Sequence, residues 1–184
     1  QQQGANWNEH MLLVRSGFSA RYLEGAFISS NIPYRFIGGV KLLESAHVKD
    51  VLSMLRVVIN PQDDIAWMRF LTLWNGVGDV GASKLAHELI ALPDIEARCQ
   101  RLERHGKVAT SAILILKQLD VLQQHVEASI ALALEALSEQ LEQNYKTQDW
   151  SRRVKDFDLV KQLGRKHGAL SEFLEEYVLE PISV

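Results

Sequence analysis

The sequence has little of what marks a secreted, metal-binding or membrane-spanning protein. Its 184 residues include one cysteine, Cys99, so no disulfide can form within the chain, and its six histidines are scattered singly, without zinc-site spacing. The longest strongly apolar stretch, 108–116, is far shorter than the roughly 18 residues that suggest a membrane span. We therefore expect a cytoplasmic protein with no structural metal and no membrane partner.

The N-terminus also lacks familiar features. It opens on Gln-Gln-Gln-Gly-Ala, without a methionine and without the charged and apolar regions of a signal peptide. The C-terminus is Glu-Pro-Ile-Ser-Val. Together these ends lead us to expect an excised piece of a longer protein.

Charge is nearly balanced along the whole chain. There are 20 lysines and arginines against 23 aspartates and glutamates, a formal net charge of −3 at pH 7. This balance excludes a general positive field, so any contact with nucleic acid must be local. One local excess lies between residues 146 and 167, where seven basic residues stand against three aspartates. A phosphate contact is one interpretation of that stretch, and a solvated helix face is the commoner one.

The N-terminal part has the pattern of an α/β unit. Met11-Leu12-Leu13-Val14 is a short apolar run typical of a strand buried in a parallel sheet, and the segment after it has helical spacing, with Ser19 as the expected N-cap. Tyr34-Arg35-Phe36-Ile37 is a second extended run, closed by Gly38-Gly39. Residues 11–37 thus predict a small α/β remnant, which is too small to form a stable sheet alone.

After Gly38-Gly39 the apolar residues follow helical spacing, which predicts a mostly α protein. Trp67, Phe70 and Trp74 fall on one stripe and are expected in the core. The expected helices are one over 47–59, one after Asp63-Asp64, one through Leu85 and Ile90, two within 113–143 with a break at Ala128-Ser129, and two more at 153–167 and 171–179.

The stretch Gly76-Val77-Gly78-Asp79-Val80-Gly81 is the motif with most to say about function. It matches the glycine spacing of a dinucleotide-binding fingerprint, but the residues before it read as a helix instead of a strand. It also has the glycine spacing of a P-loop, but Ala82 stands where the lysine is required, which argues against nucleotide hydrolysis.

A third interpretation is a helix-hairpin-helix. Glycines allow left-handed backbone conformations, so amides at the start of the second helix can point at a DNA phosphate, with Ser83 and Lys84 as further donors. Such a site binds the backbone and not the bases. The alternative is that these glycines only make a tight turn between two packed helices, and the pattern leaves both open.

No catalytic or metal-binding set is visible elsewhere. Asp63-Asp64 is more typical of a helix start than of a metal site, and Cys99 has the surroundings of an ordinary thiol. No nucleophile, base and orienting acid can be grouped from the sequence. We predict no catalytic residue and no metal ligand in this chain.

The order of segments resembles the second half of UvrD/Rep-like superfamily 1A DNA helicases. The resemblance is dense over residues 11–90 and weaker to the end of the chain. It is carried by Leu13-Val14-Arg15-Ser16, Ser19-Ala20-Arg21, Leu23-Glu24, Ile32-Pro33-Tyr34-Arg35, Gly38-Gly39, Val48-Lys49-Asp50, Leu55-Arg56, Asn60-Pro61, Asp63-Asp64, Arg69 and Gly76-Val77-Gly78. The chain departs from the family at Gly17, where an asparagine is common, and at Leu42-Leu43 and Ser45, where paired aromatics and an arginine are common.

The resemblance implies a fragment of an ATP-dependent 3′–5′ DNA helicase that acts in repair or recombination. Residues 1–37 would be part of the second RecA-like domain, 2A, and residues 38–184 the helical accessory subdomain, 2B. Arg15 would contact single-stranded DNA, and Gly76, Val77 and Gly78 would touch the duplex. ATP and Mg²⁺ would serve the parent enzyme, whereas the fragment has neither P-loop nor acidic magnesium motif and is expected to be inactive.

Two functions follow. The first is the helicase fragment, contributing DNA contact and regulation, in the bacterial cytoplasm at the nucleoid. Its partners would be DNA, repair proteins or a second copy of the fragment. The alternative is a helical protein-protein interaction module with no DNA or nucleotide role.

Overall fold

The computed structural model describes residues 6–37, 39 and 41–179, and this part of the chain is mostly helical and contains no strand. The prediction of a mostly α protein is therefore confirmed. The α-helices are α1 (Gly17–Ser29), α2 (Ala46–Ile59), α3 (Asp64–Thr72), α4 (Asp79–Ile90), α5 (Ile95–His105), α6 (Thr110–Val121), α7 (Val126–Tyr145), α8 (Trp150–Arg153), α9 (Asp156–Gly164) and α10 (Leu170–Leu174). Short turns η1 (Trp7–Glu9) and η2 (Leu42–Glu44) are 3₁₀-helical, and η3 (Glu175–Leu179) is a π-helical turn.

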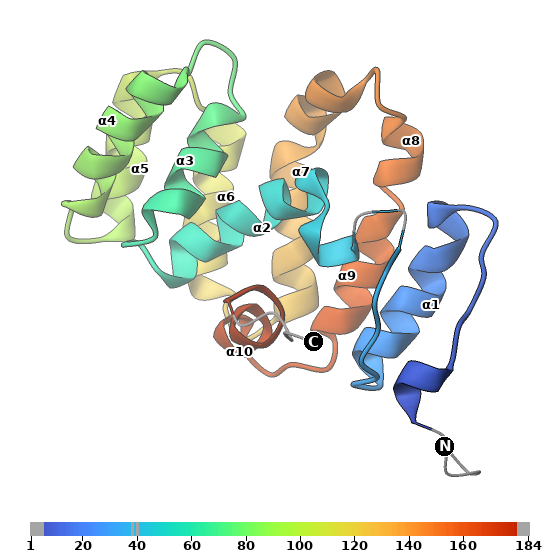
Figure 1. Ribbon diagram of the computed structural model, residues 1–184. Coiled ribbons are helices and arrows are strands. Elements are labelled where there is room, and N and C mark those ends of the chain that lie inside the picture. The colour runs from blue at the N-terminus through green and yellow to red at the C-terminus, as the bar shows by residue number, and fades with distance from the viewer. Residues whose placement is uncertain (1–5, 38, 40, 180–184) are drawn as a thin grey trace.

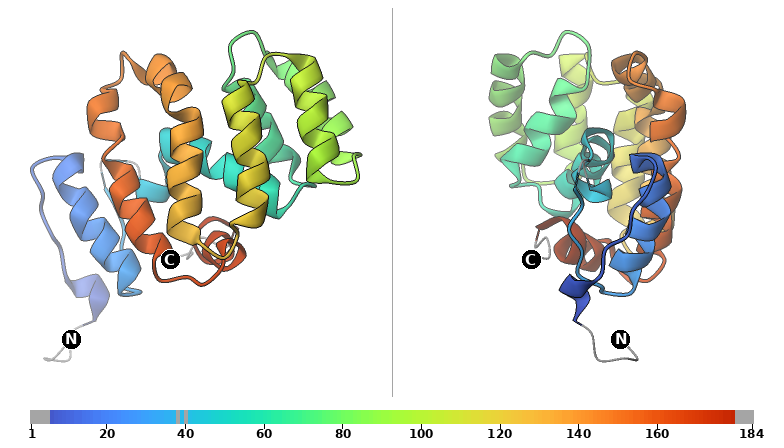
Figure 2. Two further views of the ribbon diagram at one scale, coloured as in Figure 1. Left: turned by 180° about the vertical axis from the view of Figure 1, so that it is seen from behind. Right: turned by 45° about the vertical axis from the view of Figure 1, so that its right-hand side comes forward.

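The helices stand side by side in a curved row (Figure 1). In sequence of contact the row runs α1, α9, α7, α6 and α5, and the view from behind shows these helices next to one another (Figure 2). Helix α2 crosses the row and packs against α3, α6, α7 and α10. Helix α4 closes one end of the molecule and α1 the other (Figure 1).

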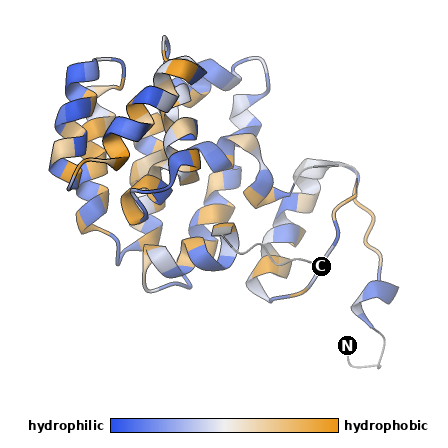
Figure 3. Cartoon of the chain, turned by 60° about the vertical axis from the view of Figure 1, so that its left-hand side comes forward, coloured by the Kyte–Doolittle hydropathy of each residue, from blue (hydrophilic) through white to orange (hydrophobic). Residues whose placement is uncertain are grey.

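The two expected strands are not formed, and this part of the prediction is wrong. Residues 11–14 and 34–37 belong to neither a helix nor a strand in the described chain. A strand needs a neighbour that exchanges hydrogen bonds with it. Met11 and Leu13 are instead 78% and 90% exposed, and the run from η1 to α1 stands out as a hydrophobic segment (Figure 3). The expected boundary at Gly38 lies outside the described residues.

Local signals fix several helix ends. Asp63 caps α3 through a hydrogen bond from the Ala66 amide to its side chain (3.0 Å), as an acidic pair at a helix start should. The N-cap of α1 is Ser16 and not Ser19, because the Ser19 amide donates to Ser16 Oγ (3.2 Å). Ser19 lies inside the first turn.

The expected break at Ala128-Ser129 is misplaced. Helix α6 ends at Val121 and α7 begins at Val126, so both residues lie within α7. Ser129 Oγ donates to the carbonyl oxygen of Leu122 (3.0 Å), across the turn between the two helices. Ser129 therefore links the first turn of α7 to the end of α6 instead of starting a helix. A serine near a helix start can either cap the helix or bond to a nearby carbonyl, and the sequence alone does not tell which.

The core is one contiguous cluster around α2. Ten of the 14 residues of α2 are buried. Trp67, Phe70 and Trp74 of the predicted stripe are 0%, 0% and 6% exposed. The ring centroids of Phe70 lie 6.1 Å from those of both tryptophans in edge-on geometry.

Glu24 anchors the end of the molecule that holds α1. Its side chain is 2% exposed and accepts hydrogen bonds from Arg21 Nη1 (2.8 Å), the Tyr34 hydroxyl (2.7 Å) and the Leu42 amide (2.8 Å). Burial, together with the Glu24 carboxylate, raises the pKa of Tyr34 far above its usual value. One carboxylate thus joins α1, the extended segment after it and η2.

Replacement of Glu24 by alanine should lower the free energy of unfolding by about 3–5 kcal/mol, because it removes the buried acceptor of the Tyr34 hydroxyl and the Leu42 amide, together with one partner of Arg21. Urea unfolding followed by circular dichroism measures the loss. Glu127→Ala is the control, since Glu127 also pairs with an arginine, Arg165, but in solvent. Equal unfolding midpoints for the two variants would show that the Glu24 cluster is not a support of the fold.

Cys99 should make the stability fall at alkaline pH. Its thiol is buried against the carbonyl oxygen of Ile113, and burial raises the pKa of Cys99 to about 11. The unfolded chain loses this proton first as pH rises, so the thiol's contribution is present below the ordinary pKa and is lost as pH approaches 11. Between pH 8 and pH 10.5, wild type should lose more unfolding free energy in urea than Cys99→Ala. Equal losses would contradict this.

Candidate functional site

The glycine turn joins the end of α3 to the start of α4. Gly76 is in the left-handed region, with φ of +81°, while Val77 is 8% exposed and its amide donates to the Trp74 carbonyl (3.1 Å). Gly78 is the N-cap of α4 with φ of −85° and ψ of 171°. Of the turn glycines at 76 and 78, only Gly76 therefore needs the conformational freedom of glycine.

The N-terminus of α4 is open to solvent. No side chain in the described part of the chain caps it, and the first helical bond runs from the Ala82 amide to the Gly78 carbonyl (2.8 Å). Asp79, Val80 and Gly81 are all exposed, and an added Cβ at Gly78 or Gly81 would meet nothing within 4 Å. The first amides of a 12-residue helix thus stand at the surface, where an anion can reach them.

Cations flank this helix end, and the sequence pattern identified only one of them. Lys84 is exposed one turn into α4, and Ser83 is half-buried. Lys107, from the loop between α5 and α6, lies over the turn, with its Nζ 3.6 Å from the position of a Cβ at residue 76. No local motif marks Lys107, because only the packing of α5 beside α4 brings its loop there. Asp79 adds one negative charge at the same helix end.

Arg15 is not part of this site. It is exposed on the segment that leads into α1. Helix α1 lies at the opposite end of the row from α4 (Figure 1). The structure therefore brings together Gly76, Val77, Gly78, Ser83 and Lys84, and it leaves Arg15 on a separate surface.

Most cations of the basic stretch 146–167 are held by the protein. Arg165 forms a two-pronged pair with Glu127 (both 2.7 Å), and Lys161 pairs with Asp158 (3.3 Å). Lys166 donates to the carbonyl oxygen of Ser29 (2.6 Å). For these three residues the pattern is that of a solvated helix face with local partners.

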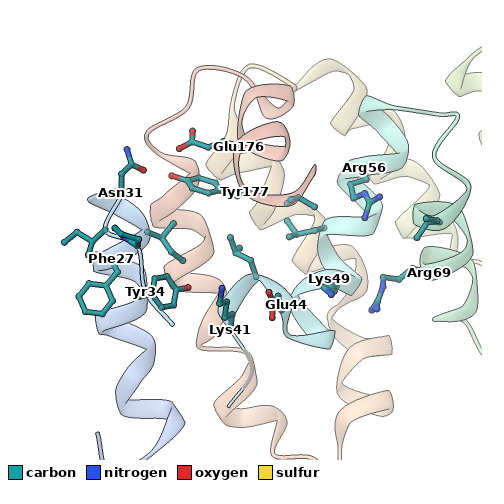
Figure 4. A pocket seen from close by; sticks show the side chains of 17 residues that line it. Phe27, Asn31, Tyr34, Lys41, Glu44, Lys49, Arg56, Arg69, Glu176 and Tyr177 are labelled. Carbon is teal, nitrogen blue, oxygen red and sulfur yellow. The ribbon is translucent and has the colours of Figure 1, made fainter. Parts of the chain in front are cut away.

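A groove of about 430 Å³ opens between α1, α2, α3 and η3 (Figure 4). Phe27, Tyr34 and Tyr177 form its aromatic side. Lys41, just before η2, and Lys49 of α2 also line it. Lys41 lies over the Tyr34 ring, 5.3 Å from its centroid. Within the described residues no three histidine, cysteine or acidic side chains gather as metal ligands, and no helix is long and apolar enough to cross a membrane.

Comparison with known proteins gives a match over the N-terminal half. A family model described as the UvrD-like helicase C-terminal domain matches residues 1–95. The ATP-dependent DNA helicase PcrA of Staphylococcus epidermidis is 37% identical over 86 residues, which are 46% of this chain and 12% of that helicase. PcrA of Staphylococcus aureus is 35% identical over the same shares. The chain thus covers only a small part of the length of these relatives.

The backbone conformations at Gly76 and Gly81 predict opposite effects of an alanine substitution on the free energy of unfolding. Gly76→Ala should lower the free energy of unfolding by about 1–2 kcal/mol, because an alanine is strained at a positive φ. Gly81→Ala should raise it by about 0.4–1 kcal/mol, because its Cβ meets open space and the unfolded chain loses freedom. Urea unfolding measures both. A Gly76→Ala variant as stable as wild type would mean that residue 76 does not hold the turn.

Proposed function

Because the chain belongs to the UvrD-like helicase C-terminal domain family, we propose that it works as a fragment of an ATP-dependent 3′–5′ DNA helicase that unwinds DNA in repair or recombination. The match over residues 1–95 is the observation that carries this proposal, and the PcrA similarity supports it. The working place is the bacterial cytoplasm, at the nucleoid.

ATP and Mg²⁺ belong to other parts of the parent enzyme. The one glycine-rich turn of phosphate-binding spacing does not fit a nucleoside triphosphate, because Ala82, at the position of the P-loop lysine, is 0% exposed. The chain itself therefore lacks ATPase activity in this proposal. Its own contribution is contact with DNA and regulation of the parent.

Residues 1–37 are assigned to the RecA-like domain 2A and residues 38–184 to the 2B subdomain. The exposure of Leu13 and Ile37, at 90% and 81%, supports this assignment, since apolar residues of a sheet are exposed when its other strands are elsewhere. Exposed apolar residues of this kind also favour self-association of the chain.

The DNA contact is assigned to the glycine turn and the start of α4, in the manner of a helix-hairpin-helix. The open amides of α4 receive one duplex phosphate, Gly76, Val77 and Gly78 shape the approach, and Ser83 and Lys84 add donors. Lys107 joins them because its ammonium lies over Gly76. Arg15, on its separate surface, contacts single-stranded DNA.

A second candidate function is a helical protein-interaction module without a DNA role. The exposed apolar residues of the N-terminal segment favour it, since such patches mark docking surfaces. DNA binding separates the two functions directly.

Duplex binding should be weak, about 10⁻⁴–10⁻⁶ M, and should fade as salt rises. Lys84→Ala and Lys107→Ala should each lower the affinity and reduce the salt slope by about one. Gly78→Val should remove binding in a folded protein, because the side chain blocks the phosphate without meeting the fold. Asp79→Asn should raise the affinity, since it removes a like charge. Fluorescence anisotropy with a labelled duplex measures all four.

The matched control is Lys161→Ala, which removes a cation that pairs with Asp158 on α9, away from the turn. Its duplex affinity should equal that of wild type. If Lys161→Ala abolishes binding while Gly78→Val keeps it, the glycine turn is only structural and α9 is the contact. If no variant and no salt concentration changes the signal, the chain has no DNA role and the interaction module is the better function.

A further inference from the structure

A second pocket lies at the other end of the molecule, between the starts of α1 and α2 and the segment that carries α8. Its volume is about 460 Å³, and Gly17 and Ala46 line it from the two helix starts. Three arginines also line it, Arg21, Arg152 and Arg153. Arg152 and Arg153 belong to the basic stretch 146–167, but Arg21 lies more than a hundred residues earlier, and only the fold brings it beside them.

Arg153 is held in this pocket by neutral groups alone. Its Nε donates to the Gln148 carbonyl (2.8 Å), its Nη2 to Gln148 Oε1 (3.2 Å) and its Nη1 to His47 Nδ1 (3.0 Å). The guanidinium also lies over the Tyr145 ring, 5.1 Å from its centroid. Among residues 6–37, 39 and 41–179 no carboxylate forms an ion pair with it. Two of its five N–H groups remain for a ligand.

The protonation state of His47 follows from these contacts. An arginine can only donate, so His47 Nδ1 accepts, and its Nε2 carries the proton that it donates to Asp156 Oδ2 (2.9 Å). The imidazole is 2% exposed and fixed from both sides. Arg153 is therefore positioned by a neutral histidine that adds no competing positive charge to the pocket.

The other two arginines at the pocket differ in whether they can bind an added anion. Arg21 is committed, since it pairs with Glu24 (2.8 Å) and reaches Asp156 (3.5 Å). Arg152 pairs with Asp149 (3.0 Å), but its side chain is 72% exposed and its partner 49%. Solvent screens such a pair, so Arg152 can turn to a stronger acceptor.

The start of α2, with its backbone N–H donors, also lies at this pocket. No side chain caps the start of α2, because Ser45 Oγ donates to the Lys41 carbonyl (3.0 Å) and accepts from Arg21 Nη2 (2.8 Å). Helix α2 has 14 residues, and Ala46 and His47 at its start line the pocket, where first-turn amides have no acceptor within the helix. These donors add to the arginines for an oxygen-rich anion.

We propose that this pocket binds a phosphate group through Arg153 and Arg152, with the first amides of α2 as further donors. The ligand is a tetrahedral oxyanion, either a phosphate of a nucleic-acid backbone or a free phosphate group. The site is separate from the glycine turn, so it stands or falls independently of the duplex contact assigned to α4.

Isothermal titration of the 184-residue chain with inorganic phosphate, at ionic strength matched with chloride, tests the proposal. Wild type should bind phosphate, and part of that binding should depend on Arg153. Arg153→Gln should lower the affinity about ten- to hundred-fold, as expected for the loss of a hydrogen-bonded charge. Because Arg153 also braces Gln148 and His47, Arg152→Gln serves as the second variant: it should lower the affinity several-fold without changing the melting temperature in phosphate-free buffer.

Arg165→Gln is the matched control, an exposed arginine paired with Glu127 outside the pocket. It should bind phosphate as wild type does. The proposal is overturned if the Arg152 and Arg153 variants keep wild-type affinity, or if Arg165→Gln loses as much affinity as they do.

The source of the phosphate is settled by competition. A single-stranded oligonucleotide without terminal phosphates should displace inorganic phosphate if the pocket takes a DNA backbone, and Arg153→Gln should then weaken oligonucleotide binding. An oligonucleotide that leaves phosphate bound identifies the ligand as a free phosphate group. Both results require Arg153-dependent phosphate binding and support the site.

Discussion

Burial of α2 on nearly all its sides is the constraint on which the other helices depend. A helix that buries ten of 14 residues needs neighbours all around it, and α3, α6, α7 and α10 fill those places. Three of the buried residues, His47, Asp50 and Ser53, are polar, so their hydrogen-bond partners are fixed as well. Asp50 pairs with Arg69 of α3 and accepts from the Tyr145 hydroxyl of α7 (2.6 Å). One helix thereby sets both the apolar packing and the ionic contacts of the row.

At the end of the molecule that holds α1, buried ionic contacts also fix how the helices are arranged. Asp156 of α9 accepts from His47 of α2 and lies 3.5 Å from Arg21 of α1, while Glu24 holds the segment after α1. Buried charges of this kind are costly when a partner is missing, so they favour one arrangement of these elements over others. Because the carboxylates of this cluster pair with other groups, Arg153 at the pocket has, among the described residues, only the neutral hydrogen-bond partners Gln148 and His47. Its positive charge can therefore receive an external anion.

Both proposed phosphate contacts depend on helix starts that no side chain caps. At α4 the N-cap is Gly78, which has no side chain, and at α2 the N-cap is Ser45, whose hydroxyl is engaged elsewhere. In contrast, the starts of α3 and α5 are capped by Asp63 and Asp94, which satisfy the same amides internally. The contrast shows how one local choice separates a structural helix start from one that can receive a ligand.

The sequence by itself determined the helical class, the end of α2, the start of α3, the apolar stripe of Trp67 and the glycine turn, because helical periodicity, proline and capping residues act over a few neighbours. It did not determine whether 11–14 would form a strand, since pairing depends on residues elsewhere, nor the role of Ser129, whose acceptor is Leu122 in the preceding turn. Only the tertiary structure placed Lys107 over Gly76 and His47 between Asp156 and Arg153. Such juxtapositions arise from the packing of distant helices, and no local sequence pattern records them.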